Sequence, residues 1–239
     1  MTRDDTRASL LASSPQLSVG ILTADLGHLA DELARLEAAR ISIVHTDVMD
    51  GVFCPMLTVG APFVAAQRTS LRKDVHLMID EPLEKASMFV KAGADMITFQ
   101  VESAANPHRV LQVLGDAQNA NDPARGIIRG IAVSPGTPLE VLPPLLDELD
   151  YVMLLAINPG WGGQAFHPGT AARVARVREL VASAGREILV GIDGGVTKGN
   201  IAEVGALGAD IVVTGSAVFD GSPDVEANAA RMRAGLSVA

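Results

Sequence analysis

The stretch Ile41-Ser42-Ile43-Val44-His45-Thr46-Asp47-Val48-Met49-Asp50-Gly51 joins a short apolar run to a polar end. The apolar part predicts a buried strand, and Gly51 marks the loop after it. Because side chains alternate along a strand, His45 and Asp47 lie on the same face of the sheet. The pair could serve as metal ligands. A hydrogen-bonded histidine followed by turn-forming aspartates would leave the same pattern.

Apolar, β-branched runs alternate with amphipathic segments along the rest of the chain, as in repeated βα units. We expect strands over residues 17–22, 41–47, 75–78, 96–99, 130–133, 151–157, 188–192 and 211–214. We expect helices over residues 26–38, 61–69, 138–146, 170–184, 201–207 and 225–232, with two more that begin at Pro82 and Pro107. Residues 115–126 lack periodicity and are expected to form a surface loop.

Eight strands alternating with eight helices predict an α/β protein with one (β/α)8 TIM barrel, whose active site lies at the carboxyl ends of the strands. A doubly wound open sheet is the alternative. An open sheet would rarely carry polar residues at so many strand ends. We expect residues 1–16 to form a flexible N-terminal segment and residues 17–239 to form the barrel domain.

Composition limits the classes of function. Hydrophobic residues make up 48% of the chain and aromatic residues only 3%, so the core must consist mainly of aliphatic side chains. A formal net charge of -9, without a cluster of lysines or arginines, argues against a nucleic-acid partner or an anionic membrane surface. The mixed-charge N-terminus does not resemble a signal peptide, and the single cysteine, Cys54, excludes an internal disulfide. We therefore expect a soluble cytoplasmic protein.

Two further polar residues occur in other predicted strands. His76 lies within the third strand, and Asp193 directly follows the seventh. With His45 and Asp47 they place two imidazoles and two carboxylates at the mouth of the predicted barrel. This set would bind one divalent metal ion, which could be Zn2+, Mn2+, Fe2+ or Co2+. Taken alone, His76 would be interpreted as a core histidine, so the metal hypothesis depends on the barrel.

Glycine-containing loops follow the last three predicted strands. They are Asn158-Pro159-Gly160-Trp161-Gly162-Gly163, Asp193-Gly194-Gly195 and Thr214-Gly215-Ser216. Glycines at strand ends let backbone N–H groups approach an anion, and the late loops of barrels commonly hold phosphate. Each loop alone could be a tight turn, but three on adjacent strands favour a phosphate site. Without a basic cluster, backbone N–H groups must hold that phosphate.

Several longer motifs occur in order along the chain. They are residues 45–51, Val75-His76-Leu77-Met78, residues 158–166, Asp193-Gly194-Gly195-Val196 and Gly215-Ser216-Ala217-Val218-Phe219. Together they resemble the ribulose-phosphate 3-epimerase family, from about Val19 to the last helix. The resemblance implies an isomerase of the pentose phosphate pathway that interconverts D-ribulose 5-phosphate and D-xylulose 5-phosphate. Because the family often self-associates, it also implies a homo-oligomer.

The resemblance assigns roles to individual residues. By similarity, His45, Asp47, His76 and Asp193 are the metal ligands, and Asp47 and Asp193 are the acid/base pair. Substrate and phosphate contacts would come from His76, Gly160, Trp161, Gly162, Gly163, Gly194, Gly195, Gly215 and Ser216. The C3 proton beside a ketone leaves only if the enediolate is stabilised, which a metal ion can do. Inversion then needs one ionised and one protonated carboxyl group on opposite faces.

The chain departs from the family pattern at substrate-facing positions. Gly20, Met56 and Leu155 stand where serine, asparagine and methionine are usual. Thr23, Gln100 and Trp161 replace serine, histidine and phenylalanine. The metal and acid/base positions are retained, so the substrate is the open question. The alternatives are a paralogue that epimerises another ketose phosphate, such as allulose 6-phosphate, and a non-catalytic sugar-phosphate-binding barrel. A decarboxylase or aldolase ranks last, because no lysine lies at a strand end.

Overall fold

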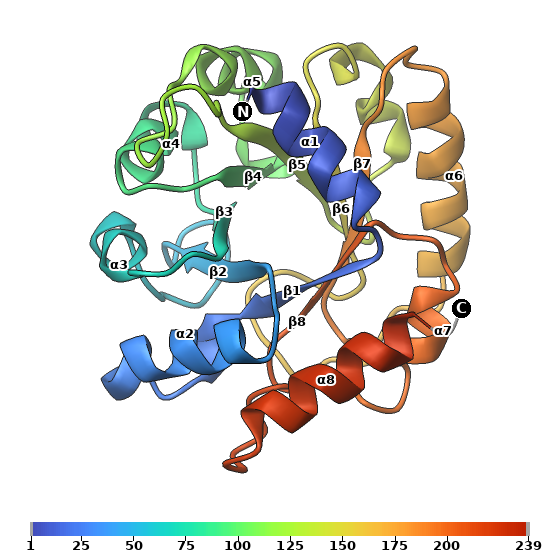
Figure 1. The fold of residues 1–239 in the computed structure, drawn as a ribbon. Helices are drawn as coiled ribbons and strands as arrows, with labels where there is room; N and C mark the ends of the chain where they lie inside the picture. Colours follow the sequence, from blue (N-terminus) through green and yellow to red (C-terminus); the bar gives the residue numbers. More distant parts are fainter. Residues whose placement is uncertain (1, 238–239) are drawn as a thin grey trace.

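A computed structural model describes residues 2–237 and shows a closed barrel of parallel strands (Figure 1). The strands are β1 (Gln16–Gly20), β2 (Ile43–Met49), β3 (Arg72–Met78), β4 (Met96–Gln100), β5 (Ile128–Val133), β6 (Tyr151–Leu155), β7 (Leu189–Asp193) and β8 (Ile211–Thr214). Each strand pairs with the next one along the chain, and β8 closes the barrel by pairing with β1. The predicted (β/α)8 class is confirmed.

Helices surround the strands (Figure 1). They are α2 (Leu29–Ala38), α3 (Ala61–Ala66), α4 (Pro82–Lys91), α5 (Pro107–Asp116), α6 (Thr170–Ala182), α7 (Ile201–Gly205) and α8 (Val225–Leu236). The predicted helix over residues 138–146 is wrong. The chain there forms two short 3-10 turns, η4 (Leu139–Val141) and η5 (Pro143–Leu145). Pro143 and Pro144 lack the N–H groups that would continue an α-helix, and their rings obstruct the preceding turn.

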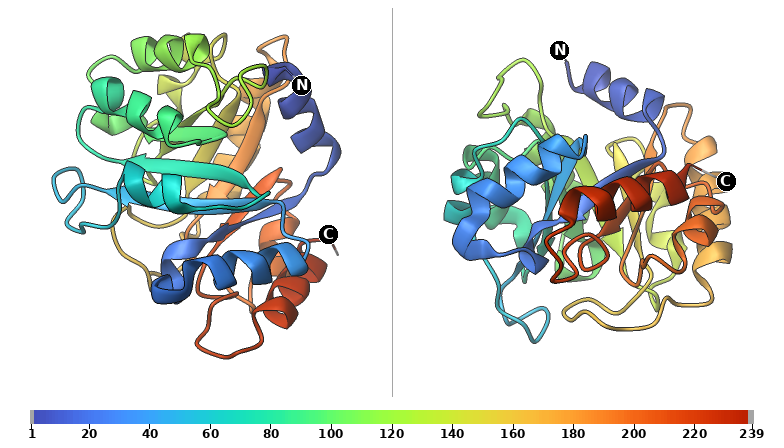
Figure 2. Two further views of the ribbon diagram at one scale, coloured as in Figure 1. Left: turned by 60° about the vertical axis from the view of Figure 1, so that its left-hand side comes forward. Right: turned by 60° about the horizontal axis from the view of Figure 1, so that its bottom comes forward.

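The segment that we expected to be flexible contains helix α1 (Arg3–Ala12). Thr2 and Asp5 form a capping box at its start, which satisfies two otherwise unpaired N–H groups. Leu10 is fully buried among side chains of the barrel interior, including Ile128. Nη1 of Arg7 donates to Oδ1 of Asp150 at 3.0 Å. Helix α1 therefore covers the amino-terminal end of the barrel, opposite the loop between β2 and α3 (Figure 2).

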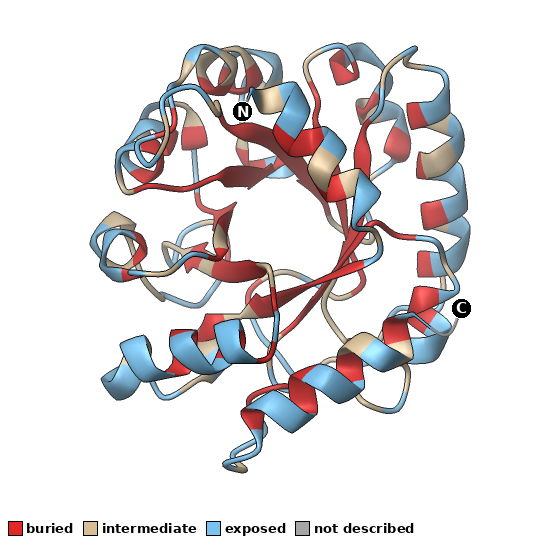
Figure 3. Cartoon of the chain, in the orientation of Figure 1, coloured by how far each residue is buried: buried red, intermediate tan, exposed pale blue. Residues whose placement is uncertain are grey.

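Apolar side chains fill two separate regions. A large cluster lies between the strands and the helices, and a smaller one lies inside the barrel. Figure 3 shows the strands mostly buried, whereas the helices expose their outer faces. Both faces of the sheet are covered, as expected for parallel strands. Within residues 2–237, none of the helices has the length and apolar character needed to span a membrane.

Candidate active site and metal centre

Two strand neighbours and one distant strand bring the predicted metal ligands together. His45 and Asp47 project from β2, and Asp47 is paired in register with His76 of β3. Asp193 is the last residue of β7. One ligand atom from each of the four residues lies within 4.8 Å of those of the other three. The arrangement forms a compact set of two nitrogen and two oxygen donors.

Hydrogen bonds orient the two imidazoles. Nδ1 of His45 lies 2.8 Å from Oδ2 of Asp74, and Nε2 lies 3.2 Å from Oδ1 of Asp47. Nδ1 of His76 lies 3.0 Å from the same Asp47 oxygen and 3.7 Å from Oδ2 of Asp193. A carboxylate that holds the far nitrogen of a histidine is the usual support of a metal ligand. The donor set therefore fits a first-row divalent cation, with Nε2 of His45 and Nδ1 of His76 facing the carboxylates.

The pKa values of the two carboxyl groups in the site shift in opposite directions. Burial alone would raise the pKa of Asp47, but the charges and hydrogen bonds of His45 and His76 hold it well below its usual range. Burial and the charge of Asp47 raise the pKa of Asp193 to about 6. Burial would lower the pKa of His45, yet Asp74 and Asp47 raise it well above its usual value. A bound cation would favour the ionised carboxylates and the neutral imidazoles.

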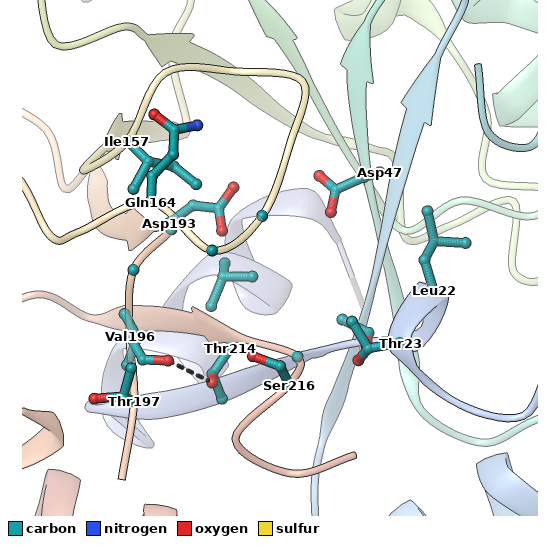
Figure 4. A pocket seen from close by; sticks show the side chains of 17 residues that line it. Leu22, Thr23, Asp47, Ile157, Gln164, Asp193, Val196, Thr197, Thr214 and Ser216 are labelled. Carbon is teal, nitrogen blue, oxygen red and sulfur yellow. Dashed lines mark hydrogen bonds between the residues drawn. The ribbon is translucent and has the colours of Figure 1, made fainter. Parts of the chain in front are cut away.

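A pocket of about 280 Å³ opens beside these residues. Asp47 and Asp193 face it from opposite sides, as Figure 4 shows. Its remaining wall consists of the ends of β1, β6, β7 and β8 and the loops that follow them: Gly20, Leu22, Thr23, Ile157, Gly162, Gly163, Gln164, Gly194, Gly195, Val196, Thr197, Val213, Thr214, Gly215 and Ser216. Neither lysine nor arginine belongs to this lining. An anion bound here would be held by backbone groups and hydroxyls.

The loop after β7 has a backbone conformation that requires glycine. Gly194 and Gly195 have φ angles of 94° and 69°, which residues other than glycine rarely adopt. A Cβ atom on Gly195 would lie 2.9 Å from the backbone Cα of Phe166. Within residues 2–237, the hydrogen bonds formed by the protein leave the backbone N–H groups of Gly195, Gly215 and Ser216 unused. These groups are free to bind a phosphate.

Not every residue of the predicted glycine-rich loop reaches the pocket. Gly162 and Gly163 line it. Gly160 packs instead on the loop between β2 and α3, where an added Cβ would lie 2.8 Å from that of Cys54. The side chain of Trp161 is 47% exposed. Gln164 supports the loop by donating to the carbonyl groups of Asn158 and Trp161, at 2.8 and 2.9 Å.

Sequence reasoning did not include Asp74 in the site. The residue is fully buried on β3, and its Oδ2 atom also accepts a hydrogen bond from Ser18 at 3.1 Å. The alternation that places His45 beside Asp47 also places Asp74 and His76 on one face of β3. The strand expected over residues 75–78 excluded Asp74, whereas β3 begins at Arg72, so the rule identifies Asp74 only when the strand is extended towards its amino-terminal end.

The positions that depart from the family pattern lie in different surroundings. Gly20 lines the pocket, and Leu155 is buried and paired in register with Asp193. Gln100 is fully buried at the end of β4. Met56 is 43% exposed on the loop between β2 and α3. Of these four, Gly20 therefore has the most direct access to a ligand in the pocket.

Comparisons with known proteins agree with this geometry. A profile described as the Ribulose-phosphate 3 epimerase family matches residues 16–219. Ribulose-phosphate 3-epimerase 2 of Cupriavidus necator is 40% identical over 217 residues, which cover 88% of this chain and 86% of that protein. Ribulose-phosphate 3-epimerase of Escherichia coli K12 is 36% identical over 225 residues, covering 92% and 96%.

Solved structures of lower identity share the fold. The 3-hexulose-6-phosphate synthase of Salmonella typhimurium matches with a TM-score of 0.60 at 16% identity, over 92% of this chain and 98% of that one. A tryptophan synthase chain of Mycobacterium tuberculosis matches with a TM-score of 0.65 at 16% identity, covering 98% and 96%. At such identities the likeness concerns the barrel alone. The extent and identity of the sequence matches show that the chain belongs to the ribulose-phosphate 3-epimerase family of isomerases.

Proposed function

We propose that the protein is a metal-dependent 3-epimerase that interconverts D-ribulose 5-phosphate and D-xylulose 5-phosphate. The observation that carries the proposal is the placement of Asp47 and Asp193 on opposite sides of one pocket, beside two imidazoles. Inversion at a carbon atom requires a proton to leave from one face and another to arrive on the opposite face. Two carboxyl groups that face each other across the substrate can perform both transfers.

The residues of the site have separate roles in this reaction. One aspartate removes the C3 proton as a general base, and the other delivers a proton to the opposite face as a general acid; in the reverse direction they exchange roles. His45 and His76, with the same two aspartates, would hold one divalent cation. When bound, this cation supplies Lewis-acid stabilisation of the negative charge that develops on the sugar oxygens. The free N–H groups of Gly195, Gly215 and Ser216 would fix the phosphate and thereby the position of C3.

Proton NMR in D2O tests the proposal. Metal-loaded protein is mixed with ribulose 5-phosphate, and deuterium is expected at C3 of both epimers. Asp47→Asn and Asp193→Asn, prepared separately and shown to retain metal, are each expected to lose epimerisation. Full activity in either variant would contradict the two-carboxylate mechanism. Tight ligand binding without any exchange would favour the non-catalytic alternative.

A different ketose phosphate is the second candidate substrate. The absence of a side chain at Gly20 favours it, because this position lines the pocket and offers no hydrogen bond to a sugar hydroxyl. The same NMR experiment with allulose 6-phosphate and other ketose phosphates compares the candidates directly. The substrate with the highest kcat/KM identifies the preferred reaction.

We also propose that the chain forms a homo-oligomer. The loop between β2 and α3 projects from the barrel (Figure 2) and exposes apolar side chains. Val52 is 71% exposed and Leu57 is 77% exposed. Covering such side chains is favourable. Light scattering after gel filtration is expected to give a mass above 24.9 kDa, and Leu57→Asp is expected to lower it. A monomeric wild-type protein would disprove the proposal.

A further inference from the structure

Tyr151 lies across the interior of the barrel, in space that two other strands leave empty. It projects inward from β6 and is fully buried. A Cβ atom on Gly130 of β5 would lie 3.1 Å from the tyrosine ring, and one on Gly191 of β7 would lie 2.0 Å from the hydroxyl oxygen. No side chain larger than hydrogen at Gly191 is compatible with Tyr151 in this position. The two glycines and the tyrosine therefore form one packing unit.

This unit lies in the same part of the interior as Asp74. In a barrel of this type, inward side chains from alternate strands form layers. Following the register around the barrel places Ser18, Asp74, Gly130 and Gly191, from β1, β3, β5 and β7, in one layer. The hydrogen bond from Ser18 to Asp74, at 3.1 Å, agrees with this placement. The tyrosine hydroxyl lies beside Gly191 of this layer, and the charge of Asp74 acts on it.

Among residues 2–237, the buried polar atoms without a hydrogen-bond partner include three in this region. They are the hydroxyl oxygen of Tyr151, Oδ1 of Asp74 and Oγ1 of Thr98. Thr98 borders the same space, because a Cβ on Gly130 would lie 2.3 Å from its hydroxyl oxygen. Burial, followed by the charges of Asp74, Asp193 and Asp210, raises the pKa of Tyr151 well above its usual value. The hydroxyl therefore keeps its proton and can donate it.

The other carboxylate oxygen of Asp74 already accepts hydrogen bonds. Oδ2 accepts hydrogen bonds from Ser18 and from Nδ1 of His45. A buried hydroxyl and a buried carboxylate oxygen that are left unpaired both destabilise the folded state. A buried water commonly bridges polar groups of this kind through about three hydrogen bonds.

We propose that Tyr151 is a positioning residue for the metal centre, which donates through one buried water to Oδ1 of Asp74. In this arrangement Tyr151 holds Asp74, and Asp74 holds Nδ1 of His45. The hydrogen-bond chain fixes the ring of His45 with Nε2 directed at the cation site. The inference rests on the proposed metal site, but not on the identity of the substrate.

Metal affinity tests the inference directly. Metal-free protein is titrated with Co2+ in competition with a chromophoric chelator. Tyr151→Phe keeps the ring that packs on the two glycines and removes only the hydroxyl. Because outer partners of a ligating histidine contribute about 10- to 100-fold to metal affinity, we expect the variant to bind Co2+ on the order of tenfold more weakly. Met96→Leu, an apolar change inside the same barrel, is the matched control and is expected to leave the affinity unchanged.

A double-mutant cycle separates positioning from general stability. Tyr151→Phe is expected to have no effect on Co2+ affinity in the Asp74→Asn background, since both changes break the same chain. Thermal unfolding of the metal-free variants monitors the barrel itself. Unchanged Co2+ affinity in Tyr151→Phe, or full additivity with Asp74→Asn, would overturn the inference while the metal site stands. If the wild-type protein binds no divalent cation, both the proposed metal site and this inference are wrong.

Discussion

Nδ1 of His76 on β3 lies 3.0 Å from Oδ1 of Asp47 on β2. The two residues are paired in register, so the backbone hydrogen bonds between β2 and β3 hold the side chains together before any ligand binds. Asp193 reaches the same point from β7. One strand pair thus supplies three of the four donors, and closure of the barrel supplies the last.

His76→Ala removes one nitrogen donor from this pre-arranged set. We expect the affinity for a divalent cation to fall by more than about tenfold, measured by equilibrium dialysis and metal analysis. His28→Ala is the control, because the His28 side chain is 69% exposed and pairs with Asp25 outside the site. Equal loss of metal in both variants would contradict the assignment of His76.

Metal binding should stabilise the native state, since the donors come together only in the folded chain. At a free-metal concentration 100 times Kd, linkage raises the free energy of unfolding by about 2.7 kcal/mol. Thermal unfolding with Zn2+ and with a chelator measures this difference. The increase is expected to be smaller in Asp193→Ala at the same Zn2+ concentration. An identical midpoint with and without Zn2+ would argue against the site.

Gly195→Ala tests the phosphate loop. The φ angle of 69° and the contact of 2.9 Å with the Cα of Phe166 exclude a methyl group without a backbone shift. We expect KM for the sugar phosphate to rise and the free energy of unfolding to fall by about 1–3 kcal/mol. Gly136→Ala is the control, because a Cβ there meets no atom within 4 Å. Steady-state kinetics and urea unfolding report the two effects separately.

Gly20→Ser restores a hydroxyl at the pocket wall. An added Cβ would lie 3.4 Å from the Cα of Gly215, which is an ordinary contact, so the side chain fits. If the substrate is ribulose 5-phosphate, we expect its kcat/KM to rise about fivefold, which corresponds to one hydrogen bond of about 1 kcal/mol. Gly20→Ala adds the same Cβ without the hydroxyl and should show no such gain. A fall in kcat/KM with Gly20→Ser alone would favour a different ketose phosphate.

Asp150 connects helix α1 to the amino-terminal end of the barrel. Its buried carboxylate pairs with Arg7, Arg129 and Arg186. Burial would raise the pKa of Asp150, but Arg129 and Arg186 hold it below its usual value. Asp150→Asn leaves these guanidinium groups without their anion, so we expect it to destabilise the fold by about 3–5 kcal/mol at neutral pH.

The pH dependence of this effect has a definite sign. Because the pKa of Asp150 is lower in the folded state, its stabilising contribution is present above the pKa of the unfolded chain and is lost as the pH falls through the folded value. The difference in unfolding free energy between wild type and Asp150→Asn should therefore shrink as the pH falls below about 4. A difference that grows on acidification would contradict the assignment.

Local patterns in the sequence were sufficient for the strands and for the four clustered donors. Alternation along residues 41–47 predicted that His45 and Asp47 lie on one face. In the structure both side chains project from β2 into the same cluster, because side chains alternate along any strand. The helix expected over residues 138–146 failed for an equally local reason, the consecutive Pro143 and Pro144. The expectation of a flexible segment over residues 1–16 did not take into account the capping pattern of Thr2 and Asp5, at which helix α1 begins.

The order of residues along the chain is thus enough to establish the barrel class, the family motifs and the donor types, because strand and helix periodicities and glycine turns are local properties. It does not reveal that Asp74 supports His45, that Gly160 packs on Cys54, or that Tyr151 fills the space beside Gly191. Those contacts join residues from different strands and loops. They depend on the register and closure of the barrel, which arise only when all strands pair at once.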